Sequence, residues 1–327
     1  MQQRITSTPR CWLGLAALLI ACSMGAHAQK FPTHAVTIVN PYPAGGGADN
    51  IARMLANHLS QEWGQAVIVE NRPGAGTTIA AAYVAKAKPD GYTLLLSSTQ
   101  HAIAPLLFKK LPYDYLTHLS AVATLSFSPF VLITPMESEF RTLDQLVLGL
   151  KQKGDKINFG SSGLGGLPHL SGVRLNQVTG AQARHIPYAG TAPAVNAILN
   201  GSTDFLFADN SIIPLIQSGK VRALAVTSDK RTESLMQTPT MAETFAGFTA
   251  TVWTGLEAPA GTPRPVIDQI HASLLKVLKE PALVKFYKDS AREMKILNPD
   301  EFTQFKESEV RTYERLVQDA KLNLIEN

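Results

Sequence analysis

The residues best suited to chemistry lie in two glycine-rich segments, PYPAGGGAD at Pro41–Asp49 and GSSGLGGLPH at Gly160–His169. Each follows an expected strand and precedes an expected helix. Glycine lets several backbone N–H groups approach one ligand atom, and a helix N-terminus adds partial positive charge, so this arrangement favours an anion. Neither segment contains lysine or arginine. We therefore expect backbone amides and hydroxyls to hold the anion, rather than an ion pair.

Phosphate is the usual anion at such segments, but both phosphate motifs fail. A P-loop needs a lysine that neither segment has, and a dinucleotide fingerprint needs a third glycine where Pro168 stands. The alternative that each segment is only a tight turn stays open, although two such segments in one chain weaken it. Valine at Gly46 or Gly163 should abolish binding, because a side chain there would fill the anion's place or forbid a positive φ.

Catalytic motifs are weak in this sequence. Ser161 and Ser162 do not form G-x-S-x-G, because Leu164 stands where the last glycine belongs. The histidines have no metal-binding spacing, so we expect no metal and no cofactor. An exported hydrolase that uses Ser161 or Ser162 with His169 and Asp209 is the alternative function.

Asp209 is the most suggestive acid, because it follows the apolar run Phe205–Ala208. It would lie at the carboxyl end of a strand, which is where open α/β sheets bind ligands. A helix N-cap or a turn residue is an equally good interpretation of this position.

Composition describes a chain that can bury a large core. It has 327 residues, of which 45% are hydrophobic and 17% charged, which favours two domains or one large α/β unit. Without Met1–Ala28 the chain has 28 basic and 26 acidic residues. This balance gives no support to nucleic-acid binding. Both cysteines, Cys11 and Cys22, precede residue 29, so the remainder has no disulfide or thiol nucleophile.

The N-terminus has the order of a secretory signal peptide. A polar, positive start is followed by the apolar run Cys11–Ala21 and by Ala26-His27-Ala28, with cleavage expected after Ala28. The apolar run is too short to span a bilayer. Leu19–Cys22 also fits a lipobox, which would tether the chain at Cys22. We expect export, with free release ahead of lipid anchoring.

Short β-branched runs alternate with amphipathic stretches along the rest of the chain, which predicts α/β architecture with mostly parallel sheets. The pattern restarts near residue 130. We therefore expect two lobes, one formed by residues 29–126 with 229–327 and the other by 127–228. The expected strands are 36–39, 66–70, 92–97, 130–134, 157–160, 183–186, 203–207 and 221–227, and the expected helices are 49–60, 77–86, 143–151, 169–178, 192–200, 265–279 and 299–320.

Several stretches, in order along the chain, resemble the solute-binding receptors of tripartite tricarboxylate transporters, the TctC or Bug family. Besides the signal peptide and YPAGGGAD, they are VENRPGAG at 69–76, KPDGYTL at 88–94, PYAGTAPA at 187–194 and APAGTP at 258–263. The resemblance implies a two-lobed periplasmic-binding-protein fold of type II. It also implies a receptor without catalysis, which closes on a small carboxylate and delivers it to a two-subunit membrane permease.

The resemblance also implies which residues border the ligand. Both glycine-rich segments would pinch one ligand carboxylate, partly through ordered waters, with the Tyr42 ring as an apolar wall. His101 could favour an acidic distal group. We expect a periplasmic monomer whose ligand is a dicarboxylate or tricarboxylate, an acidic amino acid or an aromatic acid. The expected ligand-binding residues are Tyr42, Ala44, Gly45, Gly46, Gly47, Ala48, Asp49, Ser97, Thr99, His101, Ser161, Ser162, Gly163, His169, Tyr188, Thr191 and Asp209.

Overall fold

The computed structural model describes residues 31–188, 190–290 and 292–319. The chain divides into two compact units, residues 1–33 and 34–327, and the fold below is that of the second unit alone. The expected signal peptide, with its cleavage site at Ala28 and the lipobox at Cys22, lies outside the described residues. Within the described ranges, every helix is too short or too polar to cross a membrane.

The first sheet has five strands in the order β2-β1-β3-β10-β4. Strands β1, β2 and β3 are parallel, whereas β10 is antiparallel to both β3 and β4. Their side chains are mostly aliphatic, and Val36, Ile38 and Leu94 are fully buried. The strands span Val36–Asn40 (β1), Val67–Asn71 (β2), Thr93–Ser98 (β3), Leu119–Pro129 (β4) and Thr251–Pro259 (β10).

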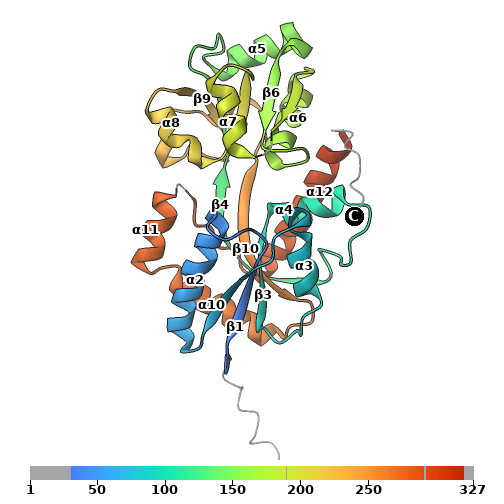
Figure 1. The fold of residues 1–327 in the computed structure, drawn as a ribbon, viewed down its shortest axis with the longest axis vertical. Helices are drawn as coiled ribbons and strands as arrows, with labels where there is room; N and C mark the ends of the chain where they lie inside the picture. Colours follow the sequence, from blue (N-terminus) through green and yellow to red (C-terminus); the bar gives the residue numbers. More distant parts are fainter. Residues whose placement is uncertain (1–30, 189, 291, 320–327) are drawn as a thin grey trace, which may run out of the picture. The chain divides into compact units, whose positions relative to one another are not determined.

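The second sheet repeats this plan in the order β7-β6-β8-β5-β9. Strands β6, β7 and β8 are parallel, and β5 is antiparallel to β8 and β9. The strands span Val131–Pro135 (β5), Asn158–Ser161 (β6), Arg184–Pro187 (β7), Phe205–Ala208 (β8) and Val221–Val226 (β9). The prediction of two α/β lobes with mixed, mostly parallel sheets is therefore confirmed (Figure 1). The lobe boundaries stay a prediction.

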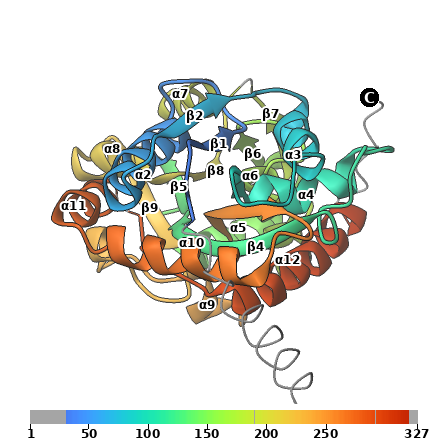
Figure 2. The ribbon, with the colours of Figure 1, turned by 90° about the horizontal axis from the view of Figure 1, so that it is seen from below.

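Amphipathic helices cover the sheets. Helix α2 buries Ile51, Leu55 and Leu59 on one face, as the sequence pattern predicts. Helices α10 and α12 run beside β4 (Figure 2). The helices are Gly47–Trp63 (α2), Thr78–Ala85 (α3), Thr99–Leu107 (α4), Leu143–Lys153 (α5), Leu167–Thr179 (α6), Thr191–Leu199 (α7), Ile213–Gln217 (α8), Met241–Thr244 (α9), Arg264–Val277 (α10), Pro281–Asp289 (α11) and Pro299–Asp319 (α12).

Two chain crossings join the sheets, and Thr227 ties them together. Strand β4 continues into β5 through Phe130, and the chain returns from β9 to β10 past Thr227 and Ala250. The Thr227 hydroxyl accepts from Phe130 N at 2.8 Å and donates to Ala250 O at 2.5 Å. Backbone hydrogen bonds of 2.9 and 3.0 Å join the same three residues. This buried triplet lies where both segments cross between the lobes, and we refer to it as the hinge.

Candidate functional site

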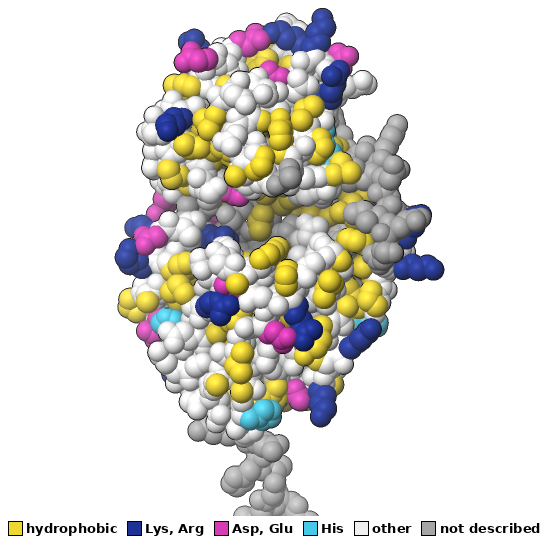
Figure 3. All heavy atoms as spheres, viewed as in Figure 1, with side chains coloured by type: hydrophobic (Ala, Val, Ile, Leu, Met, Phe, Trp, Pro, Cys, Tyr) yellow, Lys and Arg dark blue, Asp and Glu magenta, His cyan; other side chains and the backbone are white. Residues whose placement is uncertain are grey.

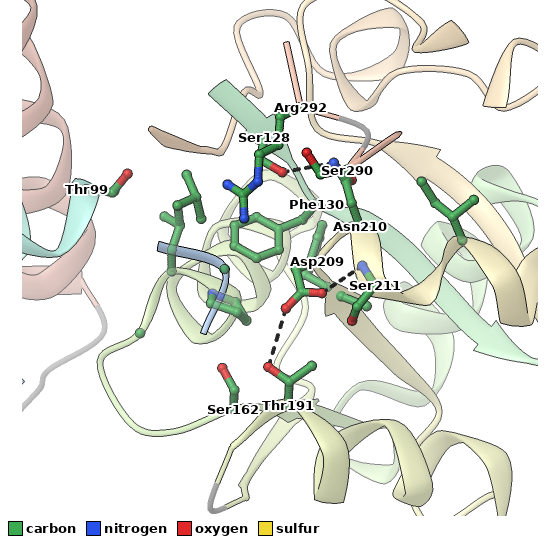
Figure 4. A pocket seen from close by; sticks show the side chains of 18 of the residues that line it. Thr99, Ser128, Phe130, Ser162, Thr191, Asp209, Asn210, Ser211, Ser290 and Arg292 are labelled. Atoms are coloured by element: carbon green, nitrogen blue, oxygen red, sulfur yellow. Dashed lines mark hydrogen bonds between the residues drawn. The ribbon is translucent and has the colours of Figure 1, made fainter. Parts of the chain in front are cut away.

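A cleft of about 950 Å³ is lined by residues that follow strands of both sheets. The molecular surface is hollowed between the two lobes (Figure 3). Its apolar wall includes Ile103, Phe130, Leu167, Phe207 and Val252. Polar side chains from both lobes and from the hinge strand β4 point into it (Figure 4). A volume of this size suits a small molecule rather than a polymer.

The first glycine-rich segment is held in place by Asp49, in the first turn of α2. The carboxylate accepts from Gly45 N at 2.9 Å, from Asn71 Nδ2 at 2.8 Å and from Arg53 Nε at 2.8 Å. The Arg53 hydrogen bond, assisted by those from Gly45 and Asn71, holds the pKa of Asp49 well below its usual range. Asn40 Nδ2 adds a longer bond of 3.3 Å. Asp49 is thus a buried brace of the segment.

Tyr42 connects this segment to the start of α4. Its hydroxyl lies 2.8 Å from Ser98 Oγ, and burial raises the pKa of the phenol. His101 is fully buried and caps α4, because its Nδ1 accepts from Ser98 N at 3.0 Å. Burial lowers the pKa of His101 to about 4, so the imidazole is neutral at physiological pH.

The second glycine-rich segment rests on two stacked histidines. The rings of His169 and His185 lie 3.7 Å apart at 19°, and His169 Nδ1 accepts from Gly165 N at 3.1 Å. Ser161 Oγ lies 2.7 Å from His185 Nε2 and 2.8 Å from Gly163 O. Burial lowers the pKa of both histidines to about 4. Neutral rings can stack closely, whereas two imidazolium ions would repel each other.

Asp209 follows β8 and points into the cleft (Figure 4). Its Oδ1 accepts from Ser211 N at 2.9 Å, so it also caps the short turn at Asn210–Ile212. Thr191 Oγ1 lies 3.5 Å from Oδ2. Both sequence interpretations of Asp209, cleft residue and N-cap, therefore fit its position.

The structure divides the expected ligand-binding residues into two groups. Some line the cleft, and others lie behind its surface or beside it. Ser97, His101 and Ser161 are fully buried, and Asp49 and His169 are nearly so. Asp49, Ser161 and His169 hydrogen-bond with the two segments, whereas His101 caps α4. Those that line the cleft are Tyr42, Gly47, Thr99, Ser162, Thr191 and Asp209; those outside its lining are Ala44, Gly45, Gly46, Ala48, Asp49, Ser97, His101, Ser161, Gly163, His169 and Tyr188.

The argument from backbone geometry holds for only one of the two glycines chosen for substitution. Gly163 has φ +146°, which a side chain would strain. Gly46 has φ −81° as the N-cap of α2, and an added Cβ would meet only Pro43 O at 3.8 Å. The positive-φ alternative therefore does not apply to Gly46, and the expectation that a side chain there would fill the anion's place stays a prediction.

The geometry disfavours the hydrolase alternative. Ser161 is buried, and its partner is His185 rather than His169. Ser162 lines the cleft, but no hydrogen bond joins it to a histidine among the described residues. Asp209 bonds to Ser211 and Thr191, so it does not orient a histidine among the described residues. In the described part of the chain, histidine and acidic side chains form no cluster that could hold a metal ion.

Sequence reasoning missed several polar residues. Asn40 and Asn71 end the neighbouring parallel strands β1 and β2. The carboxyl ends of parallel strands are where open α/β sheets bind ligands, so their place in the sequence could have indicated a role at the site. Asn210 Nδ2 donates to Ser128 Oγ at 2.9 Å, between the second lobe and the hinge strand. Arg292 also lines the cleft, so the expectation that amides and hydroxyls alone face the ligand is incomplete.

Comparison with known proteins agrees with this geometry. The family model described as "Tripartite tricarboxylate transporter family receptor" matches residues 51–322. The structure is similar to that of the periplasmic binding protein BugD, with 34% identity, a TM-score of 0.72, and coverage of 90% of this chain and all of that one.

Two further structures carry bound acids. R. palustris Rpa4515 with adipate is 28% identical, with a TM-score of 0.76 over 90% of this chain and all of that one. MatC from Rhodopseudomonas palustris with bound malate is 29% identical, with a TM-score of 0.71 over 88% of this chain and all of that one.

Proposed function

We propose, from the premise that this chain belongs to the tripartite tricarboxylate transporter receptor family, that it captures one small carboxylate in its cleft and delivers it to a two-subunit membrane permease. The observation that carries the proposal is a cleft walled by both lobes of a family member. Similar proteins with adipate and malate support a small carboxylate as the ligand.

Recognition would use the two glycine-rich segments from opposite lobes. Gly47 begins α2 and Ser162 precedes α6, and both line the cleft. Exposed N–H groups at these helix starts favour an anion. The buried residues Asp49, Ser161 and His169 act as positioning residues that fix the segments. Lobe closure about the hinge would bring both segments to one carboxylate.

Location and assembly follow from the same proposal. A receptor of this family acts in the periplasm, and residues 1–28 would direct export and be removed after Ala28. Cys22 would then leave with the signal peptide, unless the lipobox is used instead. We propose a monomer, because one cleft within one chain suffices to bind a small acid.

Mass spectrometry of small molecules released by unfolding freshly purified protein tests the function. A receptor should release one unaltered small acid per chain. The hydrolase alternative predicts that an added ester or amide is consumed, so product formation during incubation would contradict the proposal.

Substitution of the second segment tests the site. We expect Gly163→Val to lose binding of the identified acid in calorimetric titration, because valine cannot adopt φ +146° without strain. A thermal melt checks that the variant is folded. Unchanged affinity in the folded variant would remove this segment from the site.

A further inference from the structure

Arg292 places a positive charge in the cleft from a fixed backbone position. Its backbone N–H donates to Tyr287 O at 3.0 Å, at the end of α11. The next residue, Glu293, exchanges two hydrogen bonds of 2.8 Å with Phe127 in β4. The side chain is half-buried, lines the cleft and points into it (Figure 4). The guanidinium therefore extends from a well-anchored segment of the first lobe.

The Arg292 guanidinium makes no hydrogen bond or ion pair with any other residue in the described ranges. Other arginines of the chain have partners: Arg53 pairs with Asp49, Arg231 with Glu243, and Arg264 with Asp268 and Asp300. A guanidinium carries five N–H donors and no acceptor, so its partial burial is favourable only when acceptors reach it. Burial lowers the pKa of Arg292, while Tyr287 and Asp209 oppose that shift.

The charge lies against the start of α2. A Cβ added to Gly47 would come within 3.0 Å of Arg292 Nη2. The N-cap residue of this helix, Gly46, has no side chain to satisfy the first N–H groups. Backbone N–H groups at the start of α2 and the planar, charged guanidinium of Arg292 thus lie at the same end of the cleft. Guanidinium and carboxylate match in shape, which makes such a pair stronger than neutral hydrogen bonds.

Lys288 also lines the cleft, but its surroundings differ from those of Arg292. Lys288 is exposed on α11, next to Asp289, which pairs with Lys285 at 2.6 Å. Asp209 belongs to the second lobe, so the two half-buried charges of the cleft come from opposite lobes. Arg292 is therefore the cation best placed to meet a bound anion.

We propose that Arg292 is a ligand-binding residue whose guanidinium pairs with an ionised carboxylate of the bound acid beside Gly47. This inference rests on the proposed function and changes its chemistry, because charge pairing then adds to recognition by amides. The ligand class remains small carboxylic acids, with selection against neutral analogues at this end of the cleft.

Calorimetric titration of the full mature chain with malate, adipate and the acid released on unfolding tests this role. For any acid that the wild type binds, we expect Arg292→Gln to weaken binding roughly 10- to 100-fold, the effect of losing a charged hydrogen bond. Arg292→Lys should recover part of the affinity, because the charge remains and the fork is lost. Arg311→Gln, an exposed site on α12, removes the same charge elsewhere and should bind as the wild type does.

Salt dependence separates ligand pairing from a structural role. Wild-type affinity should fall by less than about tenfold between about 20 and 150 mM salt, and Arg292→Gln should flatten that dependence. Equal affinity and equal salt dependence in Arg292→Gln and wild type would overturn the role of Arg292 alone. Failure of the wild type to bind any of these acids would instead count against the proposed function, and this inference would fall with it.

Discussion

At the residue scale, Asp209 is the unusual group, because it is a carboxylate in a cleft proposed to bind carboxylates. Two such charges 4 Å apart repel by about 4 kcal/mol at an effective dielectric constant near 20. Its Oδ1 is bound to Ser211 N, and Oδ2 has a long contact of 3.5 Å with Thr191. Oδ2 is thus available to accept from a ligand hydroxyl or ammonium group.

We expect Asp209→Asn to lower ligand affinity roughly 10- to 100-fold, because a charged acceptor is lost. The melting temperature should change little, since asparagine also caps the turn after β8. Titration calorimetry and a thermal melt measure the two effects. Asp204→Asn is the matched control, because Asp204 accepts from Asn158 N at the opposite end of β8. Tighter binding in Asp209→Asn would contradict this role.

Asp49 leads to a different prediction, because its carboxylate is buried and both oxygens already accept hydrogen bonds, from Gly45, Arg53 and Asn71. Asp49→Asn should reduce the free energy of unfolding by about 1.5–3 kcal/mol, the range for hydrogen bonds to a charged group. Its depressed pKa means that this contribution is present above the ordinary pKa near 3.8 and is lost as pH falls below it. Urea unfolding at neutral pH measures the change, and a stability equal to wild type would refute the brace.

At the element scale, the sequence predicted the elements with a clear hydrophobic period. Strands β1 and β2 and helix α2 lie within a few residues of their expected bounds. Strand β4 was missed, because Leu119–Pro129 is rich in alanine, serine and threonine and is buried on both faces, so it lacks alternation. Helix α4 was missed because Pro105 lies inside it.

The candidate site was predictable only where motifs mark it. Glycine-rich segments between strand and helix pointed to Gly47 and Ser162, which line the cleft. The same segments also contain Asp49, Ser161 and His169, whose side chains turn inward and hydrogen-bond with the backbone. Residue type could not reveal that direction. Arg292 belongs to no motif and reaches the cleft only through the bridge between Glu293 and Phe127.

The buried histidines that support α4 and the second glycine-rich segment make the stability of the fold depend on pH. Burial lowers the pKa of His101, His169 and His185 from the ordinary 6.5 to about 4. Between these values the unfolded chain binds more protons, so this stabilisation is complete above about pH 6.5 and is lost as pH falls toward 4.

We expect the melting temperature to drop steadily as pH is lowered from 7 to 4, with a shallower slope in His169→Gln. His58→Gln, on α2 and away from the second segment, is the control and should keep the wild-type slope. Identical slopes in all three proteins would show that the stacked pair does not govern the acid response. Thermal melts in buffers of equal ionic strength make the comparison.

At the scale of the whole molecule, acidic and basic side chains are interspersed on the face seen in Figure 3. The formal net charge is only +4 over 327 residues. Long-range attraction therefore contributes little, and recognition depends on local geometry where the lobes meet. That geometry depends on the hinge, because Phe130 belongs both to the hinge and to the cleft wall.

Thr227 gives a direct test of this coupling. Thr227→Val keeps the shape but leaves Phe130 N and Ala250 O without the hydroxyl, at a cost of about 1–3 kcal/mol for buried polar groups. Thr134→Val is the matched control: it also removes a fully buried hydroxyl, bonded to Phe140 O at 3.2 Å, but within one lobe. We expect both variants to lose stability in urea unfolding. Only Thr227→Val should change ligand affinity in calorimetry, because only this variant loosens the Phe130 ring and the angle between the lobes. Equal affinity in both variants would mean that the hinge hydrogen bonds stabilise the fold without shaping the cleft.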